Sequence, residues 1–224
     1  MSTKKQDIYE ENYFDFISSV FVDDCSRNYV MTDDETDYIY DIAGKVCYEN
    51  DDATNTQIGI FRILYADVER MINEKISPVH AFNAFSQEIL EYYKALFDND
   101  FDFNDSVINT FGGDLGTNDL NLLVLDRLEI HPDYRGKSLG LKVMEYMMKR
   151  YGRGAGLVAI KPFPLQFEQC NNDEKWNEWY VQYDLSDFSQ DEVIATKKLC
   201  AYYGKIGFRH LENIPYMIRP VWLV

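Results

Sequence analysis

Residues 128–141 decide the fold that the sequence predicts, and they read Leu128-Glu129-Ile130-His131-Pro132-Asp133-Tyr134-Arg135-Gly136-Lys137-Ser138-Leu139-Gly140-Leu141. The apolar run 120–130 is typical of a central strand, and Pro132 ends it. From Gly136 to about Tyr151 the apolar residues recur with the spacing of an amphipathic helix. The junction is therefore a strand, a tight turn that contains glycine, and a helix.

The turn before this helix predicts an anion site. The first N–H groups of a helix have no partner within the helix, and glycine lets a bulky anion approach this positive end. Arg135, Lys137 and Lys142 add positive charge beside it. The motif of a P-loop is absent, and Gly136 and Gly140 are spaced differently from the glycines of a dinucleotide-binding turn. Main-chain amides here are thus expected to hold a pyrophosphate.

The distribution of charge favours the same place. The 224 residues include 22 basic and 38 acidic side chains, a net charge of −16, and a field of that sign repels nucleic acid and anionic lipid surfaces. Residues 127–153 hold seven basic and three acidic side chains, so this segment is positive while the remainder is strongly negative. We expect a phosphorylated small ligand, and neither nucleic acid nor membrane, as the partner.

Length predicts one domain with additions or two small domains, and cysteine usage predicts a reducing compartment. A chain of 224 residues that is 46% apolar can build a core without disulfides or a structural metal. The four cysteines form no C-x-x-C pair and the three histidines lack ligand spacing, so no metal site is expected. The polar start and the absence of a long apolar run predict a soluble, cytoplasmic protein.

The first half of the chain predicts a hairpin and a helix. Residues 38–48 and 57–67 are rich in β-branched and aromatic side chains and flank a polar stretch, which is the pattern of a β-hairpin. Ser77 and Pro78 are typical of a helix start, and apolar residues at helical spacing extend the predicted helix to Phe97.

The second half predicts elements that complete an α/β domain. Residues 156–161 form a short apolar strand pattern. The sequence Ser189-Gln190-Asp191-Glu192 has the form of a capping box and predicts a helix that ends at Gly207. Residues 208–222 are rich in apolar side chains and are expected to return to the sheet.

Two motifs, in order along the chain, indicate one family. Residues 135–140 fit the pattern R/Q-x-x-G-x-G/A between a strand and a helix, with Ser138 where the first glycine is usual. Residues 201–208, Ala-Tyr-Tyr-Gly-Lys-Ile-Gly-Phe, look like a helix that ends in tyrosine, three residues and Gly-Phe. Together they resemble the GNAT superfamily of acyl-CoA-dependent N-acyltransferases. The resemblance covers roughly residues 38–224.

The resemblance implies an α/β fold with a mixed, splayed central sheet flanked by helices. It also implies acetyl-CoA as cosubstrate, no metal, and direct attack of a primary amine on the thioester in a ternary complex. The pantetheine arm would bond the main chain of residues 128–130, and the diphosphate would meet the amides of residues 136–141. The expected cofactor-binding residues are Leu128, Glu129, Ile130, Arg135, Gly136, Lys137, Ser138, Leu139, Gly140 and Leu141.

Three side chains are the catalytic candidates. Tyr203 has the family's position for the acid that protonates the leaving thiolate, although it and Tyr202 are both also suited to a core. Asp126 and Glu129 are the carboxylates available as a base, and strand alternation places them on opposite faces, Asp126 with the face of Leu128. Pairing with nearby basic groups explains either carboxylate equally well.

The domain organisation is expected to be a single GNAT-type domain over residues 1–224. It would carry an N-terminal extension at about 1–37, a helical insertion at about 77–119 and an aromatic, acidic insertion at about 162–188. In the last, Trp176, Trp179, Tyr180 and Tyr183 would share one helix face. That face suits either the binding of a cation or packing on the domain.

The acceptor is expected to be a small-molecule amine or a protein amine, and a homodimer is one expected assembly. The alternative to an enzyme is a non-catalytic module on the same fold. It would bind coenzyme A, or present its acidic surface to a basic protein.

Overall fold

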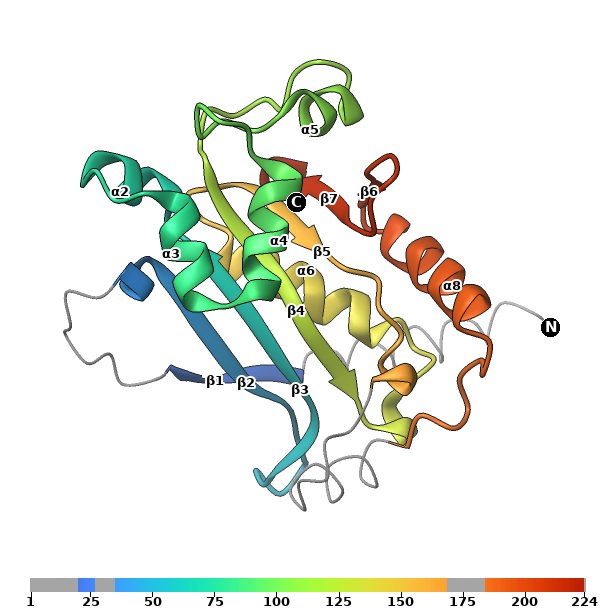
Figure 1. The fold of residues 1–224 in the computed structure, drawn as a ribbon. Coiled ribbons are helices and arrows are strands. Elements are labelled where there is room, and N and C mark those ends of the chain that lie inside the picture. The colour runs from blue at the N-terminus through green and yellow to red at the C-terminus, as the bar shows by residue number, and fades with distance from the viewer. Residues whose placement is uncertain (1–19, 27–34, 169–183, 224) are drawn as a thin grey trace.

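One open, mixed β-sheet forms the centre of the molecule, with helices on both faces (Figure 1). The structure, a computed structural model, describes residues 20–26, 35–168 and 184–223. The sheet has the order β1-β2-β3-β4-β5-β7-β6. Its strands are β1 (Val20–Ser26), β2 (Ile39–Glu49), β3 (Asn55–Ala66), β4 (Asn121–Ile130), β5 (Ala155–Ile160), β6 (Arg209–His210) and β7 (Met217–Pro220). The predicted α/β class with a mixed sheet is confirmed.

Strand pairing confirms the predicted hairpin and adds neighbours to it on both sides. Strands β2 and β3 form the predicted antiparallel hairpin, and β3 continues antiparallel to β4. Strands β4 and β5 are parallel, which requires a crossover, and helix α6 (Leu139–Tyr151) supplies it. The last segment of the chain returns to the sheet as predicted, because β7 pairs with β5.

Helices cover both faces of the sheet. Helices α3 and α4 lie over one face, and α6 lies over the other (Figure 1). In the described ranges the α-helices besides α6 are α2 (Val68–Asn73), α3 (Pro78–Phe85), α4 (Gln87–Leu96), α5 (Asp105–Thr110) and α8 (Glu192–Gly204). The 3-10 turns are η1 (Glu35–Tyr38), η2 (Pro132–Tyr134), η3 (Leu165–Phe167) and η4 (Val221–Leu223). Among the described residues no helix combines the length and apolarity needed to cross a bilayer.

The single helix predicted from Pro78 to Phe97 is wrong, because the structure has two helices there. Ser86 interrupts them with an extended backbone, φ −169° and ψ 156°. Its hydroxyl accepts a hydrogen bond from the Ile89 N–H and so caps α4. The apolar spacing continues through the break, so periodicity alone did not reveal it.

The boundaries of α6 and α8 also differ from the prediction. Helix α6 begins at Leu139, not Gly136, because Gly136 and Ser138 have φ of +84° and +56°. The predicted capping box is wrong, since Asp191 caps α8 by accepting a hydrogen bond from the Ile194 N–H. Helix α8 ends at Gly204, before the predicted end.

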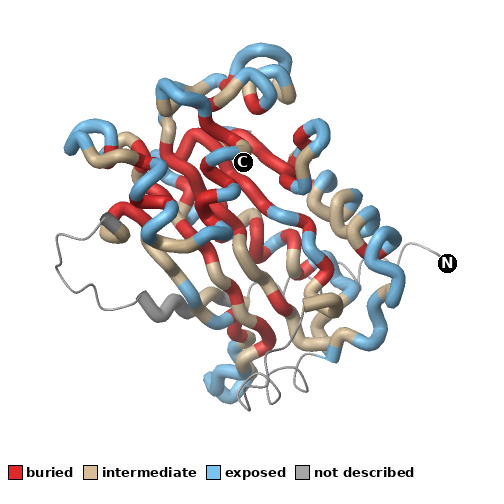
Figure 2. Tube along the Cα trace, in the orientation of Figure 1, coloured by how far each residue is buried: buried red, intermediate tan, exposed pale blue. Residues whose placement is uncertain are grey.

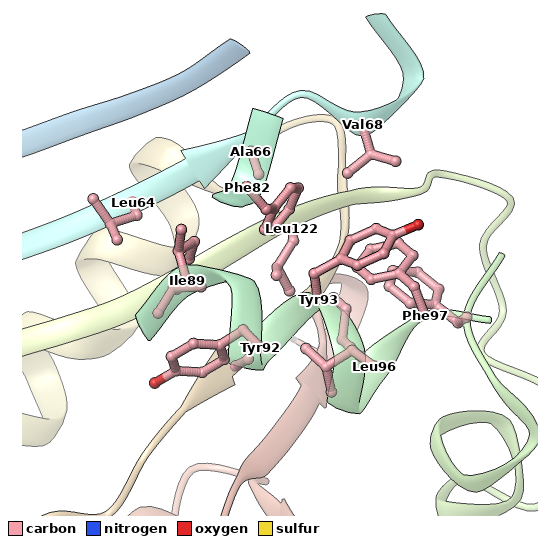
Figure 3. Close-up of a cluster of buried hydrophobic side chains, with 14 of the residues drawn as sticks. Leu64, Ala66, Val68, Phe82, Ile89, Tyr92, Tyr93, Leu96, Phe97 and Leu122 are labelled. Atoms are coloured by element: carbon pink, nitrogen blue, oxygen red, sulfur yellow. The ribbon is translucent and has the colours of Figure 1, made fainter. Parts of the chain in front are cut away.

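Two apolar clusters hold the sheet between its helices. The cluster on the α4 face contains three adjacent aromatic rings: Tyr93 is stacked on Phe97 and tilted against Phe82, with centroids 4.9 Å apart in both pairs (Figure 3). The cluster on the α6 face contains Met144 and Met147, both almost fully buried. Figure 2 shows the buried residues concentrated along the central strands, whereas α8 is mostly partly buried or exposed.

The predicted N-terminal extension and the two predicted insertions have different outcomes in the structure. The helical insertion at 77–119 contains α3, α4 and α5. Part of the N-terminal extension, β1, pairs antiparallel with β2 as an edge of the sheet. The aromatic face predicted at Trp176, Trp179, Tyr180 and Tyr183 lies outside the described residues.

Candidate functional site

Strand β4 separates from β5 halfway along its length. The two strands pair over Asn121–Val124, and the remaining residues 125–130 of β4 pair only with β3. Strand β5 pairs with β7 through Ile160. Within the described residues, the second half of β4 therefore has one edge without a strand partner. We call residues 125–130, with this edge, the free half of β4.

A β-bulge lies where the free half begins. Arg62 is opposite Arg127 and Ile63 is opposite Leu125, so Asp126 has no partner in the register. A bulge shifts the alternation of side chains by one residue. Asp126 consequently contacts Arg62 with an Oδ2–Nη1 distance of 3.0 Å.

The prediction that Asp126 and Glu129 lie on opposite faces of the strand is therefore wrong. Arg127 and Asp126 line one pocket, and Arg127 donates a hydrogen bond to Glu129, so both carboxylates belong to the α4 face. Leu128 and Ile130 pack instead against the cluster on the α6 face. Uninterrupted alternation could not reveal the bulge, because it depends on the pairing with β3.

The turn before α6 leaves several main-chain amides for a ligand. The Ser138 side chain makes no capping hydrogen bond, and no described residue bonds the amides of Leu139 and Gly140. Beside Gly136, where a side chain would stand, no atom of the part of the chain that the structure describes lies within 4 Å. These groups form the positive end of a 13-residue helix at the end of the free half of β4.

The third amide of α6 is already bonded. The Tyr202 hydroxyl from α8 accepts a hydrogen bond from the Leu141 N–H at 3.2 Å. A Cβ at position 140 would stand 2.8 Å from that hydroxyl, so Gly140 is also required for the approach of Tyr202. Sequence reasoning considered Tyr202 only as a core residue, because the contact joins residues 61 positions apart.

The basic residues of the turn have different positions. Arg135 donates from Nε to the Ile130 carbonyl at 2.8 Å and from Nη1 to the Asp184 carbonyl at 2.7 Å, and its guanidinium lies over the ring of Phe188. Burial lowers the pKa of Arg135. Lys137 is exposed on the turn. Arg135 therefore links the end of β4 to the segment that precedes α8.

Tyr203 lies at the edge of the cluster on the α6 face. Its ring is near those of Tyr202 and Phe208, with centroids 5.9 Å and 6.4 Å away. Its hydroxyl makes no hydrogen bond with a described residue. Burial raises the pKa of Tyr203 well above its ordinary value, so the phenol keeps its proton at neutral pH.

A pocket of about 690 Å³ lies on the α4 face beside the free half of β4. Arg62, Asp126 and Arg127 line it from the sheet, and Lys161 and Glu168 line it from the segment after β5. Asp126 and Arg127 thus belong both to the strand that separates from β5 and to the wall of this pocket. Its volume is typical of a small-molecule site.

Arg127 is the centre of an ion-pair network in this wall. It donates to Glu129 at 2.6 Å and to Glu168. Burial lowers the pKa of Arg127, but its hydrogen bonds to Glu168 and Glu129 outweigh burial and raise it. Glu129 has a side chain only 4% exposed, so it is a buried counter-ion. The sequence contained no signal for Glu168, which is 41 residues from Arg127.

The described residues contain no group of three or more His, Cys, Asp or Glu side chains that could hold a metal ion. Comparison of the chain with protein-family models, with curated proteins and with solved structures gives no match.

Proposed function

We propose that the chain is an N-acetyltransferase that moves an acetyl group from acetyl-CoA to a primary amine. The observation that carries the proposal is the separation of β4 from β5 beside the N-terminus of α6. A free strand edge offers N–H and C=O groups to an extended chain that contains amides. The helix N-terminus at the end of that edge offers amides to a diphosphate. Coenzyme A has an amide-containing arm and a diphosphate joined in that order.

The pocket on the α4 face supports an acceptor site. It is lined by the same strand that would hold the thioester, so an amine bound there would approach the acetyl group from the opposite face of the sheet. Holding both reactants in one complex replaces a bimolecular encounter and supplies much of the rate enhancement. A main-chain N–H near Ile130 would stabilise the oxyanion that develops on the thioester carbonyl.

The reaction requires two proton transfers. The amine nitrogen attacks the thioester carbonyl, the new C–N bond forms, and the C–S bond breaks to release coenzyme A thiolate. Asp126, directly or through water, would accept the proton that the amine loses. The Tyr203 phenol, protonated at neutral pH, would donate a hydrogen bond to the departing thiolate in the transition state, and the released thiolate would take its proton from solvent. We assign Glu129 to holding Arg127, because that carboxylate is buried against the guanidinium.

Thiol release from acetyl-CoA with a panel of amines tests the proposal. We expect amine-dependent release with wild-type protein. Tyr203→Phe should lower kcat and kcat/KM together by about 10- to 10⁴-fold, because the hydroxyl acts mainly in the transition state. Tyr146→Phe is the matched control, since Tyr146 is exposed on α6. Full turnover by Tyr203→Phe would contradict the role proposed for Tyr203. The absence of turnover by the wild-type protein with any amine would contradict the proposed activity.

The second candidate is a module that binds coenzyme A without catalysis. Two backbone groups expected to bind the cosubstrate already have partners, the Leu141 N–H with Tyr202 and the Ile130 carbonyl with Arg135. Calorimetry with coenzyme A separates the candidates. Binding without turnover would favour the module, and binding with turnover the enzyme.

A further inference from the structure

In the wall of the pocket on the α4 face, two carboxylates pair with a single arginine, Arg62. Arg62 makes two hydrogen bonds to Asp41, from Nε at 3.0 Å and from Nη2 at 3.1 Å, and a third from Nη1 to Asp126 at 3.0 Å. One positive charge is thus shared by two negative charges. No described residue bonds Oδ1 of Asp126, whose side chain is 16% exposed. This oxygen can accept a hydrogen bond from a ligand.

Arg127, which also lines the pocket, likewise pairs with two carboxylates. Its guanidinium donates to Glu129 and to Glu168, so two carboxylates again share one cation. No described residue bonds Oε1 of Glu168, whose side chain is 36% exposed. The pocket therefore has a second carboxylate that can accept a hydrogen bond from a ligand.

The remaining charges of the described lining residues cancel. Lys161 and Glu88 both line the pocket from exposed positions and carry opposite charges. With the two arginine clusters included, the described residues of the walls and their immediate supports have an excess of two negative charges. The protein as a whole, at −16, adds a field of the same sign.

A buried polar group also faces this pocket. Tyr92 is 2% exposed, yet it is among the lining residues. Figure 3 shows its hydroxyl directed away from the other labelled side chains. No described residue accepts a hydrogen bond from the Tyr92 hydroxyl. Its ring and that of Phe163 give the pocket apolar surface beside its charged groups.

We infer that the pocket takes an organic dication, a molecule with two ammonium groups separated by a short apolar chain. Two half-free carboxylates match two ammonium groups, and the aromatic rings match methylene groups and attract cations. The volume of about 690 Å³ accommodates such a molecule, whereas a protein surface would not enter it. The inference rests on the proposed function only in making one of the two amino groups the acetyl acceptor.

Calorimetric titration of the full chain without acetyl-CoA tests the inference directly. The probes are 1,4-diaminobutane and 1-aminobutane at the same low ionic strength. They share a four-carbon chain and differ in the second amino group. We expect the diamine to bind at least about tenfold more tightly, because a second charge meets a second carboxylate in a partly enclosed site. Equal affinities, or no binding of the diamine, would overturn the inference.

Two variants locate the binding. Glu168→Gln and Asp126→Asn each remove one charge while keeping the shape of the side chain, and each should reduce the preference for the diamine to about twofold or less. Glu91→Gln is the matched control, because Glu91 pairs with Lys94 on the exposed side of α4 outside the pocket. Loss of the preference in Glu91→Gln, or its retention in both pocket variants, contradicts this site.

Turnover separates this inference from the proposed function. If the diamine binds through Asp126 and Glu168 and no acetyl group is transferred, the dication site stands and the transferase activity fails. If 1-aminobutane is acetylated as efficiently as the diamine, the activity stands and the dication site fails.

Discussion

The two halves of β4 differ in burial and in the number of strands with which they pair. Residues 121–124 are all buried and pair with β5, and residues 122–124 also pair with β3. Residues 125–130 pair with β3 only, and most are partly exposed. The first half belongs to the core. The second half has an unpaired edge, and its polar side chains line the pocket on the α4 face.

The difference shows how a strand can supply both stability and a site. The apolar residues of the first half contact helices on both faces of the sheet. The bulge at Asp126 then places charged side chains on the α4 face, while Leu128 and Ile130 stay on the α6 face. Substitutions in the two halves should therefore have different consequences for stability and binding.

The largest effect on stability is expected from breaking the charge network of the second half. Arg127→Met removes the guanidinium that pairs with the buried carboxylate of Glu129, and we expect a loss of about 3–5 kcal/mol in the free energy of unfolding. Urea unfolding followed by circular dichroism measures it. The double variant Arg127→Met with Glu129→Leu should recover most of the loss. A single variant as stable as wild type would show that water already reaches Glu129.

A core substitution in the first half should have the next largest effect. Leu122 is fully buried and lies within the cluster of Figure 3. Leu122→Ala should lower the free energy of unfolding by about 3 kcal/mol, since it removes apolar contacts and leaves a cavity. Leu128→Ala, the same change in the free half, should lower it by about 1 kcal/mol. Equal losses from the two variants would contradict the division of β4.

Alkaline pH should weaken the fold where the core meets the pocket. Burial raises the pKa of Tyr92 well above its ordinary value of 10.0. Below pH 10 both states keep this proton. Above it the unfolded chain loses the proton while the folded chain keeps it, so unfolding becomes more favourable by about 1.4 kcal/mol per pH unit. Urea unfolding at pH 9, 10 and 11 should show a shallower decline for Tyr92→Phe, and identical slopes would exclude this contribution.

The smallest effect concerns the helix end beside the free half. The Tyr202 hydroxyl accepts the Leu141 N–H that a diphosphate would otherwise bind. Tyr202→Phe frees this amide, and we expect coenzyme A to bind about 2- to 10-fold more tightly, the equivalent of one hydrogen bond. Titration calorimetry of wild type and variant measures the change. Weaker binding by the variant would mean that the hydroxyl helps to hold the ligand.

Local patterns predicted the elements that make the candidate site. The apolar run before Pro132 corresponds to β4, and the helical spacing after Leu139 corresponds to α6. Such patterns suffice because burial of one face imposes a period of two on a strand and of 3.6 on a helix. Interruptions were missed where the period continues across them, as at Ser86 between α3 and α4.

The sequence by itself determined the α/β class, the hairpin, the strand-turn-helix junction and the positive segment around it. Only the tertiary structure decided which face Asp126 takes, that Tyr202 reaches the amide of Leu141, and that Glu168 joins Arg127. The physical reason is distance along the chain. Periodicity and turn chemistry act between near neighbours in sequence, whereas a bulge register, a buried ion pair and a pocket wall depend on segments that only folding brings together.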